Sequence, residues 1–288
     1  MKGEIINRFV KQSIFDELLT TTLYKTHLKN DIEKGHVYPA LRKDEIDFYY
    51  RGGKLFGYDK KGFSTHIKYA SVIRSNRGGE YISESELKNN GIITLDDFDK
   101  EYIRIQENCE RYAFDEDIGI STLYHNFSIT NKKSNVIVLD IEISLEKTED
   151  DERKNRIDLL LYNKQKKTLR FYEAKNYLNK EIWSKDGVPK VKSQIARYNK
   201  QIKRDYQNIF DTYSKYIEQA NLFWNCELPL PEKIEDQTAL LVFGFDIDQR
   251  DGRLKSLLLN KKVLGDIRCY SKGKIKDVNI ETLWAQTK

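Results

Sequence analysis

The sequence predicts a mixed α/β (α+β) protein in which a larger C-terminal domain follows a smaller α+β domain. Three short runs between residues 135 and 176 are rich in β-branched and aromatic side chains and are separated by polar hinges, a pattern typical of strands. Residues 190–224 carry apolar side chains at steps of three and four, which is typical of an amphipathic helix. The polar segment 75–91 contains Gly and Asn and marks the expected boundary, so we place the domains at 1–90 and 91–288.

The expected N-terminal domain begins with a helix and continues as a small antiparallel sheet. Residues 45–73 alternate between apolar and polar side chains, and Gly52-Gly53 and Lys61-Gly62 interrupt them where hairpin turns are expected. We expect the aromatic side chains of these hairpins in the core, with base stacking or contact with a partner protein as the alternative. A period close to 3.6 predicts a helix within residues 5–33, with an apolar face made of Ile6, Phe9, Val10, Ile14, Leu18 and Leu19.

The expected C-terminal domain has the order helix, three strands, helix, strand. The first helix starts at a Thr or Asp cap, and the three strands that follow in close succession form a simple meander. A polar helix-like stretch to about residue 262 and a short apolar segment at 267–271 complete the chain. The expected bounds are 94–114 for the first helix, 135–146, 156–163 and 168–176 for the strands, 190–224 for the second helix and 238–248 for the last strand.

Composition narrows the classes of protein to consider. Hydrophobic residues make up 39% and charged residues 33% of the 288 residues, which is typical of a folded globular chain. The net charge of +5 is small, so a surface that binds nucleic acid must be local.

Motifs narrow these classes further. The three cysteines lack C-x-x-C spacing, which argues against a disulfide framework or a zinc site and favours a cytoplasmic location. We expect neither a signal sequence nor a membrane span. H-E-x-x-H and G-x-S-x-G motifs are missing from the sequence, which disfavours zinc-protease and serine-hydrolase chemistry.

Acidic and basic side chains meet on two of the expected strands. Period-two alternation places Asp158 on one face of its strand with Leu160, and Ile157 and Leu159 on the other face. It also places Glu173 and Lys175 together on a face of the next strand. Charged groups on apolar strands are costly unless they pair with each other or with a metal. Two neighbouring carboxylates suit Mg²⁺, for which Mn²⁺ substitutes, and the Lys175 ammonium could hold the attacking water and offset charge on a phosphate.

The segments IDLLLYN at 157–163 and FYEAKN at 171–176 resemble the central motif of the PD-(D/E)xK nuclease superfamily, whose restriction-endonuclease-like fold has an αβββαβ core. The resemblance covers roughly residues 96–248 and leaves the first ninety residues unexplained. It implies that Asp158, Glu173 and Lys175 are catalytic, and that Asp158, Glu173 and the backbone carbonyl of Ala174 bind the metal. One departure is that Ile157 stands where the motif often has Pro.

Further residues extend the resemblance or lie near the expected site. Gln194 and Tyr198 match the Q-x-x-x-Y element of the RecB-like branch and lie on neighbouring turns of one helix face, although Tyr198 also belongs to the apolar stripe. Glu142 on the first strand is the expected additional acid, with a solvated edge residue as the alternative. Glu110 is a weaker candidate on the preceding helix.

A basic face on the long helix is expected to follow a nucleic-acid backbone, because the helix leads away from the proposed site. The alternative is an ordinary solvated face. Its residues are Lys190, Lys192, Arg197, Lys200, Lys203 and Arg204.

These features predict a Mg²⁺-dependent nuclease, an endonuclease or exonuclease that hydrolyses phosphodiester bonds in DNA rather than RNA. A role in bacterial antiviral defence is an analogy to the superfamily only. The alternatives are an RNase, or a non-catalytic nucleic-acid or protein interaction module in which E-x-K is a structural ion pair. A homodimer, or a protein partner bound through the N-terminal domain, stays open.

Overall fold

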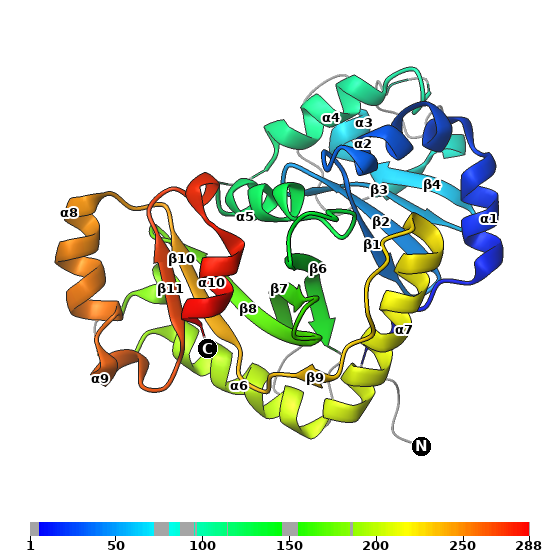
Figure 1. The fold of residues 1–288 in the computed structure, drawn as a ribbon. Helices are drawn as coiled ribbons and strands as arrows, with labels where there is room; N and C mark the ends of the chain where they lie inside the picture. Colours follow the sequence, from blue (N-terminus) through cyan, green and yellow to red (C-terminus); the bar gives the residue numbers. More distant parts are fainter. Residues whose placement is uncertain are drawn as a thin grey trace.

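The computed structural model describes residues 6–71, 81–86, 95, 97–113, 115–145, 155–184 and 187–287, and shows a mixed α+β protein with two sheets (Figure 1). The boundary expected near residue 90 lies outside the described residues.

The N-terminal sheet is antiparallel, with its strands in chain order. Arg51 and Gly52 both have positive φ, of 48° and 89°, so a two-residue turn of type I′ joins the second and third strands near the expected break. Gly62, with φ of 98°, follows the next turn, as expected. The strands are β1 Tyr38–Arg42, β2 Glu45–Tyr50, β3 Gly53–Asp59, β4 Gly62–His66 and β5 Tyr81–Ser83.

The single helix expected within residues 5–33 is wrong in detail. Thr21 is extended, with φ of −68° and ψ of 145°, and it separates α1 from the helical turns that follow. Phe9 lies before α1 and is 52% exposed, and Leu19 is 41% exposed, so the apolar face is narrower than expected. The elements are α1 Gln12–Thr20, the π-helical turn η1 Tyr24–Leu28 and α2 Lys29–Glu33.

The C-terminal sheet has the strand order β11-β10-β8-β7-β6, with β9 also paired to β8. The expected meander is confirmed, because β6, β7 and β8 are antiparallel neighbours, whereas β10 and β11 continue the sheet in parallel. β10 is shorter than expected because Gly244, with φ of 82°, turns the chain out of the strand after Phe243, and Asp246 then caps α8. The strands are β6 Val136–Leu145, β7 Asn155–Asn163, β8 Thr168–Asn176, β9 Lys233–Ile234, β10 Ala239–Phe243 and β11 Cys269–Lys272.

Two of the expected helices differ from those observed. The helix expected at 94–114 corresponds to α4, and the sequence analysis missed α5 after it. The helix expected at 190–224 is interrupted at Asp205, where φ is −109° and ψ is 18°. The helical elements are α3 Ile67–Ala70, η2 Glu84–Glu86, α4 Tyr102–Arg111, α5 Asp115–Asn126, η3 Lys180–Ile182, α6 Lys190–Arg204, α7 Tyr206–Trp224, α8 Ile247–Gln249, η4 Arg250–Leu258, α9 Lys261–Leu264, η5 Ile275–Asp277 and α10 Ile280–Gln286.

Helices cover both faces of the C-terminal sheet. On one face Leu159 and Leu161 pack in the same cluster as residues of α5 and α10. On the other face Leu160 and Tyr162 pack in a cluster that contains residues of α7 and of the N-terminal sheet (Figure 1). One hydrophobic core therefore extends from the N-terminal sheet into the C-terminal sheet.

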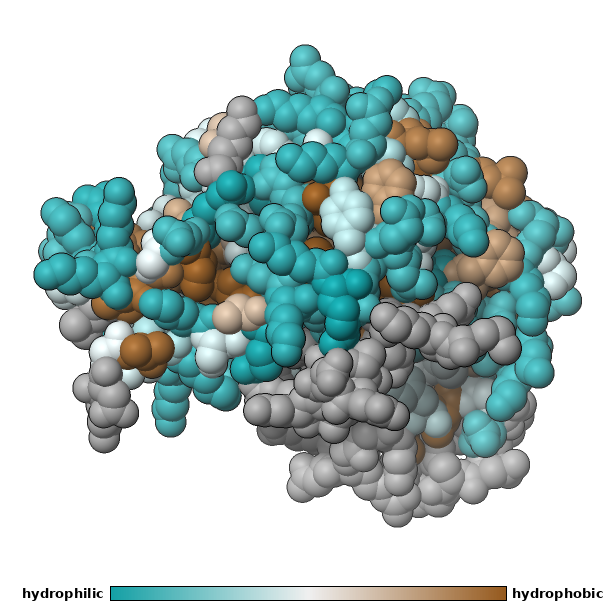
Figure 2. Space-filling view, turned by 90° about the horizontal axis from the view of Figure 1, so that it is seen from below, coloured by the Kyte–Doolittle hydropathy of each residue, from teal (hydrophilic) through white to brown (hydrophobic). Residues whose placement is uncertain are grey.

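One face of the molecule, seen from below the view of Figure 1, is mostly hydrophilic where its residues are described, with smaller hydrophobic areas between (Figure 2). Within the described ranges, no helix combines the length and the apolar character needed to cross a lipid bilayer.

A buried ion cluster around Asp140 of β6 joins the two parts of the chain. The carboxylate accepts hydrogen bonds from Arg8 Nε at 2.9 Å, Arg42 Nη1 at 2.8 Å and the Tyr213 hydroxyl at 2.8 Å. Burial raises the pKa of Asp140, but Arg42 and Arg8 outweigh it, so the pKa is lowered overall. The N-terminal segment, β1, β6 and α7 therefore meet at one satisfied carboxylate.

We expect Asp140→Asn to lower the free energy of unfolding by about 3 to 5 kcal/mol, because buried Arg8 loses the carboxylate with which it pairs and Arg42 is left with the more distant Asp47, at 3.4 Å. Urea unfolding at pH 7 measures this. Glu232→Gln is the matched control, because its ion pair with Lys167 is exposed and should cost less than about 1 kcal/mol. Equal losses of unfolding free energy in the two variants would show that Asp140 does not hold the N-terminal and C-terminal parts of the chain together.

Candidate active site

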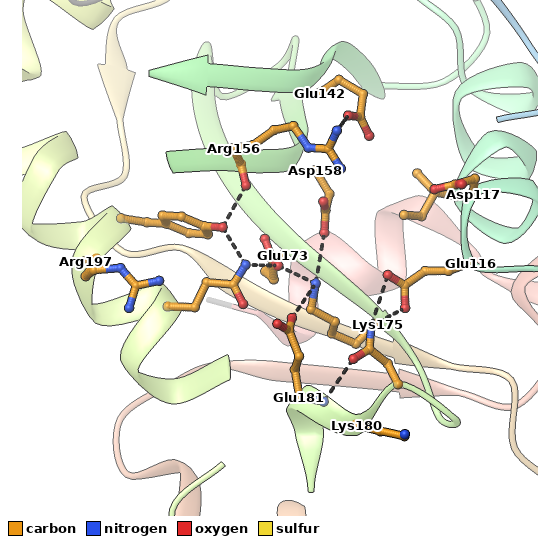
Figure 3. Close-up of a pocket in the computed structure, with 14 residues that line it drawn as sticks. Glu116, Asp117, Glu142, Arg156, Asp158, Glu173, Lys175, Lys180, Glu181 and Arg197 are labelled. Carbon is orange, nitrogen blue, oxygen red and sulfur yellow. Dashed lines mark hydrogen bonds and ion pairs between the residues drawn. The ribbon is translucent and has the colours of Figure 1, made fainter. Parts of the chain in front are cut away.

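A polar cleft of about 640 Å³ lies where α5, β6, β7, β8 and α6 meet (Figure 3). Among the described residues that line it, six are acidic and four are basic, so the cleft has an excess of negative charge. The acidic residues are Glu116, Asp117, Glu142, Asp158, Glu173 and Glu181, and the basic ones are Arg156, Lys175, Lys180 and Arg197.

In the β6–β7 pair, the face of the sheet to which the side chains point changes where two of these acids, Glu142 and Asp158, enter the cleft. Ile143 pairs with Ile157 and packs towards α7, whereas Ile141 pairs with Leu159 and packs towards α5. Regular alternation therefore fails between these pairs, and the expectation that Ile157 and Leu159 share a face is wrong. The change coincides with Glu142 of β6, whose φ of 51° lies outside the extended range, while the register of the two strands stays regular on either side of it.

β8 keeps its alternation. Glu173 and Lys175 lie beside Leu240 and Val242 of β10, which pack in a cluster with residues of α6. Ala174 packs in the cluster on the opposite face of the sheet. The expectation that Glu173 and Lys175 share a face is therefore confirmed.

Lys175 is surrounded by acids, and Asp158, Glu173 and Lys175 meet in the one cleft (Figure 3). Its Nζ lies 2.5 Å from Glu173 Oε1, 3.5 Å from Glu181 Oε2 and 3.9 Å from Asp158 Oδ2. Burial lowers the pKa of Lys175, but the carboxylates of Asp158 and Glu173 outweigh it, so the pKa is raised. The ammonium therefore keeps its proton at neutral pH.

Of the two central carboxylates, that of Glu173 is not fully satisfied. Asp158 Oδ2 accepts a hydrogen bond from the Ala174 N–H at 2.8 Å, but Glu173 Oε2 is buried and has no hydrogen-bond partner. Burial and then the nearby Asp158 carboxylate raise the pKa of Glu173 well above its ordinary value. Burial likewise raises the pKa of Asp158. A proton or a cation between the two carboxylates would relieve this repulsion.

The donor set fits a hard divalent cation. In the part of the chain that the structure describes, no group of three or more His, Cys, Asp or Glu side chains is placed to hold a metal ion. Mg²⁺, however, commonly binds through one or two carboxylates together with waters and phosphate oxygens of the substrate. Asp158 and the unpartnered Glu173 Oε2 provide such a pair. A role for the Ala174 carbonyl as a metal ligand stays a prediction.

Gln194 and Tyr198 connect α6 to the cleft. Gln194 Nε2 donates to Glu173 Oε1 at 2.7 Å and to the Tyr198 hydroxyl at 2.6 Å, and this hydroxyl donates to the Arg156 carbonyl at 2.7 Å. Gln194 Oε1 is a second buried oxygen without a partner. These two residues therefore touch the site and hold Glu173 in place relative to β7.

Glu142 also reaches the cleft, where Arg156 Nη1 lies 2.8 Å from its Oε2. Burial raises the pKa of Glu142 to about 7, and Arg156 offsets only part of this effect. The additional acid expected on β6 therefore lies in the cleft.

Other lining residues were missed by the sequence analysis. Glu116 accepts hydrogen bonds from the Asn176 N–H at 2.8 Å and from Asn179 Nδ2 at 2.9 Å, so it fixes the end of β8. Glu181, in η3, bridges Lys175 and Lys190. Glu110, the helix acid named from the sequence, is 49% exposed and lies beside Arg51, away from the residues that line the cleft.

The basic residues expected to follow a nucleic-acid backbone separate into several environments. Of the set, Arg197 lines the cleft. Lys190 lies 2.5 Å from Glu181, and Lys192 donates to the Val263 carbonyl at 2.7 Å. Farther along α6, Lys200 is exposed, Lys203 lies 3.3 Å from Asp236 and Arg204 lies 2.8 Å from Asp205.

Comparisons of the chain with protein-family models, with curated protein sequences and with solved structures found no match. The function is therefore inferred from the geometry of the cleft.

We expect Glu173→Gln to flatten the pH dependence of stability in EDTA. A raised pKa means that the folded state favours the protonated acid, so the stability from Glu173 is fully present below the unfolded-state pKa of about 4.3 and is lost as the pH rises through the folded-state value. Wild type should therefore lose stability relative to Glu173→Gln as the pH rises above the unfolded-state pKa of about 4.3, as urea unfolding measures.

Glu235→Gln is a control of opposite sign. Glu235 contacts Arg170 and Arg268 at 2.8 Å each, and these partners lower its pKa despite burial. Its stabilising contribution is present above the unfolded-state pKa and is lost as the pH falls, so wild type should gain stability over Glu235→Gln as the pH rises. The same sign for both variants would contradict an electrostatically strained Glu173.

Proposed function

We propose that the protein is a metal-dependent nuclease that hydrolyses phosphodiester bonds, in DNA by preference. The observation that carries this proposal is a buried carboxylate pair, Asp158 and Glu173, with an unpartnered oxygen and a protonated Lys175 in contact. Buried groups with perturbed pKa values in a cleft are characteristic of functional sites.

We further propose that the chain has a restriction-endonuclease-like core. The order α5, β6, β7, β8, α6, β10 supports this proposal, because it follows the helix, three strands, helix, strand order of that fold, with α7 and the short β9 inserted between α6 and β10. The positions of Asp158 on β7 and of Glu173 and Lys175 on β8 are those that the resemblance implies.

Asp158 and Glu173 would hold the cation, Mg²⁺ or Mn²⁺. When bound, the ion supplies positive charge at the scissile phosphate and lowers the pKa of water. The excess negative charge of the cleft is consistent with this need, since a phosphodiester would otherwise be repelled.

The chain's own residues supply orientation. The Ala174 N–H fixes Asp158, and Gln194 fixes Glu173, so both carboxylates are preorganised before a substrate arrives. Because its pKa is raised, Lys175 acts as a cation that positions water and offsets charge on the phosphate, not as a base.

The competing function is a non-catalytic module in which Lys175 and the acids form a structural ion cluster. The 2.5 Å contact between Lys175 and Glu173 favours this reading. The two proposals differ in what the loss of Lys175 does to stability and to cleavage.

We expect Lys175→Ala and Asp158→Ala each to lower cleavage by about 100-fold or more, because each removes a preorganised charge at the reacting phosphate. The assay compares supercoiled plasmid, linear duplex, single strands and RNA, with Mg²⁺, Mn²⁺ or EDTA. EDTA should abolish cleavage by wild type. Lys167→Ala, at an exposed ion pair outside the cleft, is the control and should cleave like wild type.

The structural alternative predicts the reverse pattern. If the cluster only stabilises the fold, Lys175→Ala leaves two acids unpaired and lowers the melting temperature, while no variant differs from wild type on any nucleic acid. That result would refute the nuclease proposal.

Charge reversal on α6 tests the binding face. We expect the triple variant Lys200→Glu, Lys203→Glu and Arg204→Glu to bind nucleic acid more weakly and with a shallower salt dependence, because fewer counterions are released. Fluorescence anisotropy between about 50 and 200 mM salt measures both. The control reverses the same charge at the exposed residues Lys25, Lys29 and Lys34. Equal effects of the two triples would assign the α6 face to solvent.

A further inference from the structure

A second groove, of about 890 Å³, continues the acidic cleft towards the N-terminal sheet. The two cavities have five lining residues in common, so they form one continuous surface. The shared residues are Glu116, Asp117, Glu142, Arg156 and Asn179.

The character of the surface changes along this continuation. Beyond the shared residues, the groove is lined by Tyr49 of β2, Tyr69 of α3, Tyr81 of β5 and Leu178, which follows β8. Lys54 is the charged side chain among the described residues of this extension, and it is held at 2.5 Å by Glu45 and 2.6 Å by Asp47. The extension is therefore aromatic and largely uncharged, unlike the cleft.

Two side chains of the extension are open to a ligand. Tyr81 is 50% exposed. Lys54 Nζ lies over one face of its ring, 5.2 Å from the centroid, and the His66 ring makes an edge contact at 5.3 Å between centroids, so a base would stack on the other face. Leu178 is 73% exposed. A fixed tyrosine ring and an open leucine present apolar surface beside a site that we propose for a phosphodiester.

Such surfaces suit the faces of nucleobases and not phosphates. In a duplex the faces of a base are covered by its stacked neighbours, so aromatic side chains reach them only when the base is unpaired or turned out of the stack. An apolar side chain near the backbone can also separate neighbouring bases.

We propose, resting on the nuclease function proposed above, that this extension binds an unpaired nucleobase next to the phosphodiester held in the cleft. The preferred substrate is then a single-stranded segment, and the N-terminal sheet supplies the specificity for it. Tyr81 stacks on the base, and Leu178 packs against the opposite side of the segment. The occupant is nucleic acid because the extension is continuous with the proposed catalytic cleft.

The test measures binding in EDTA, where cleavage does not occur, with fluorescent single-stranded DNA and a blunt duplex of the same sequence. We expect Tyr81→Ala to weaken single-strand binding by about 5- to 100-fold, the range for loss of one stacked base, and to leave duplex binding unchanged. Tyr81→Phe should bind like wild type, because the ring face is kept. An oligonucleotide with 2-aminopurine should be quenched by wild type and less by Tyr81→Ala.

Leu178→Ala provides a second variant at an exposed position that does not threaten folding, and Leu222→Ala, 67% exposed on α7, is its matched control. The subsite is supported if Leu178→Ala weakens single-strand binding and Leu222→Ala does not. Equal binding of RNA and DNA single strands also supports it. Equal losses on duplex and single strands, or no loss in any variant, would overturn it. If wild type cleaves nucleic acid but Tyr81→Ala binds single strands as wild type does, the proposed subsite alone is refuted. If single-strand binding depends on Tyr81 but no metal supports cleavage, the nuclease proposal is refuted.

Discussion

The buried carboxylate of Asp140 is the interaction on which the arrangement of the molecule depends. It lies on β6, two residues before Glu142, and receives Arg8, Arg42 and the Tyr213 hydroxyl from three other parts of the chain. Because removing one partner of a buried ion pair is costly, these groups cannot separate without a large loss of stability. The N-terminal sheet is thereby held beside the cleft.

Two buried ion clusters on the same sheet have opposite electrostatics. Around Asp140 two guanidinium groups pair with one carboxylate, and the pKa of this carboxylate is lowered despite its burial. Around Lys175 one ammonium serves several acids, and the pKa values of Asp158 and Glu173 are raised. The first cluster stabilises the fold as it stands. In the second, a proton or a further positive charge would relieve the repulsion between the carboxylates, and the nuclease proposal assigns that role to a metal ion.

The sequence predicted the central strands and the meeting of Asp158, Glu173 and Lys175, because alternation and motif spacing act over a few residues. It missed α5, whose apolar residues do not form a single stripe, and so missed Glu116. It missed β1, in which Tyr38 and Leu41 pack in different clusters, because a strand buried on both faces shows no alternation. The face on which Ile157 lies was predicted wrongly, because it changes beside a residue of positive φ in the neighbouring strand β6. The spacing of residues within β7 does not encode that torsion angle.

The interruption of the helix at Asp205 allows the segment 190–224 to fit within a compact molecule. A straight helix over 190–224 would be about 52 Å long, against a radius of gyration of about 19 Å expected for a compact chain of this length. Such a rod would extend across the whole molecule. Two shorter helices can instead take separate directions, so that α6 reaches Glu173 through Gln194 while α7 reaches Asp140 through Tyr213. One residue with non-helical torsion angles thus lets a single amphipathic segment contact both the cleft and the ion cluster around Asp140.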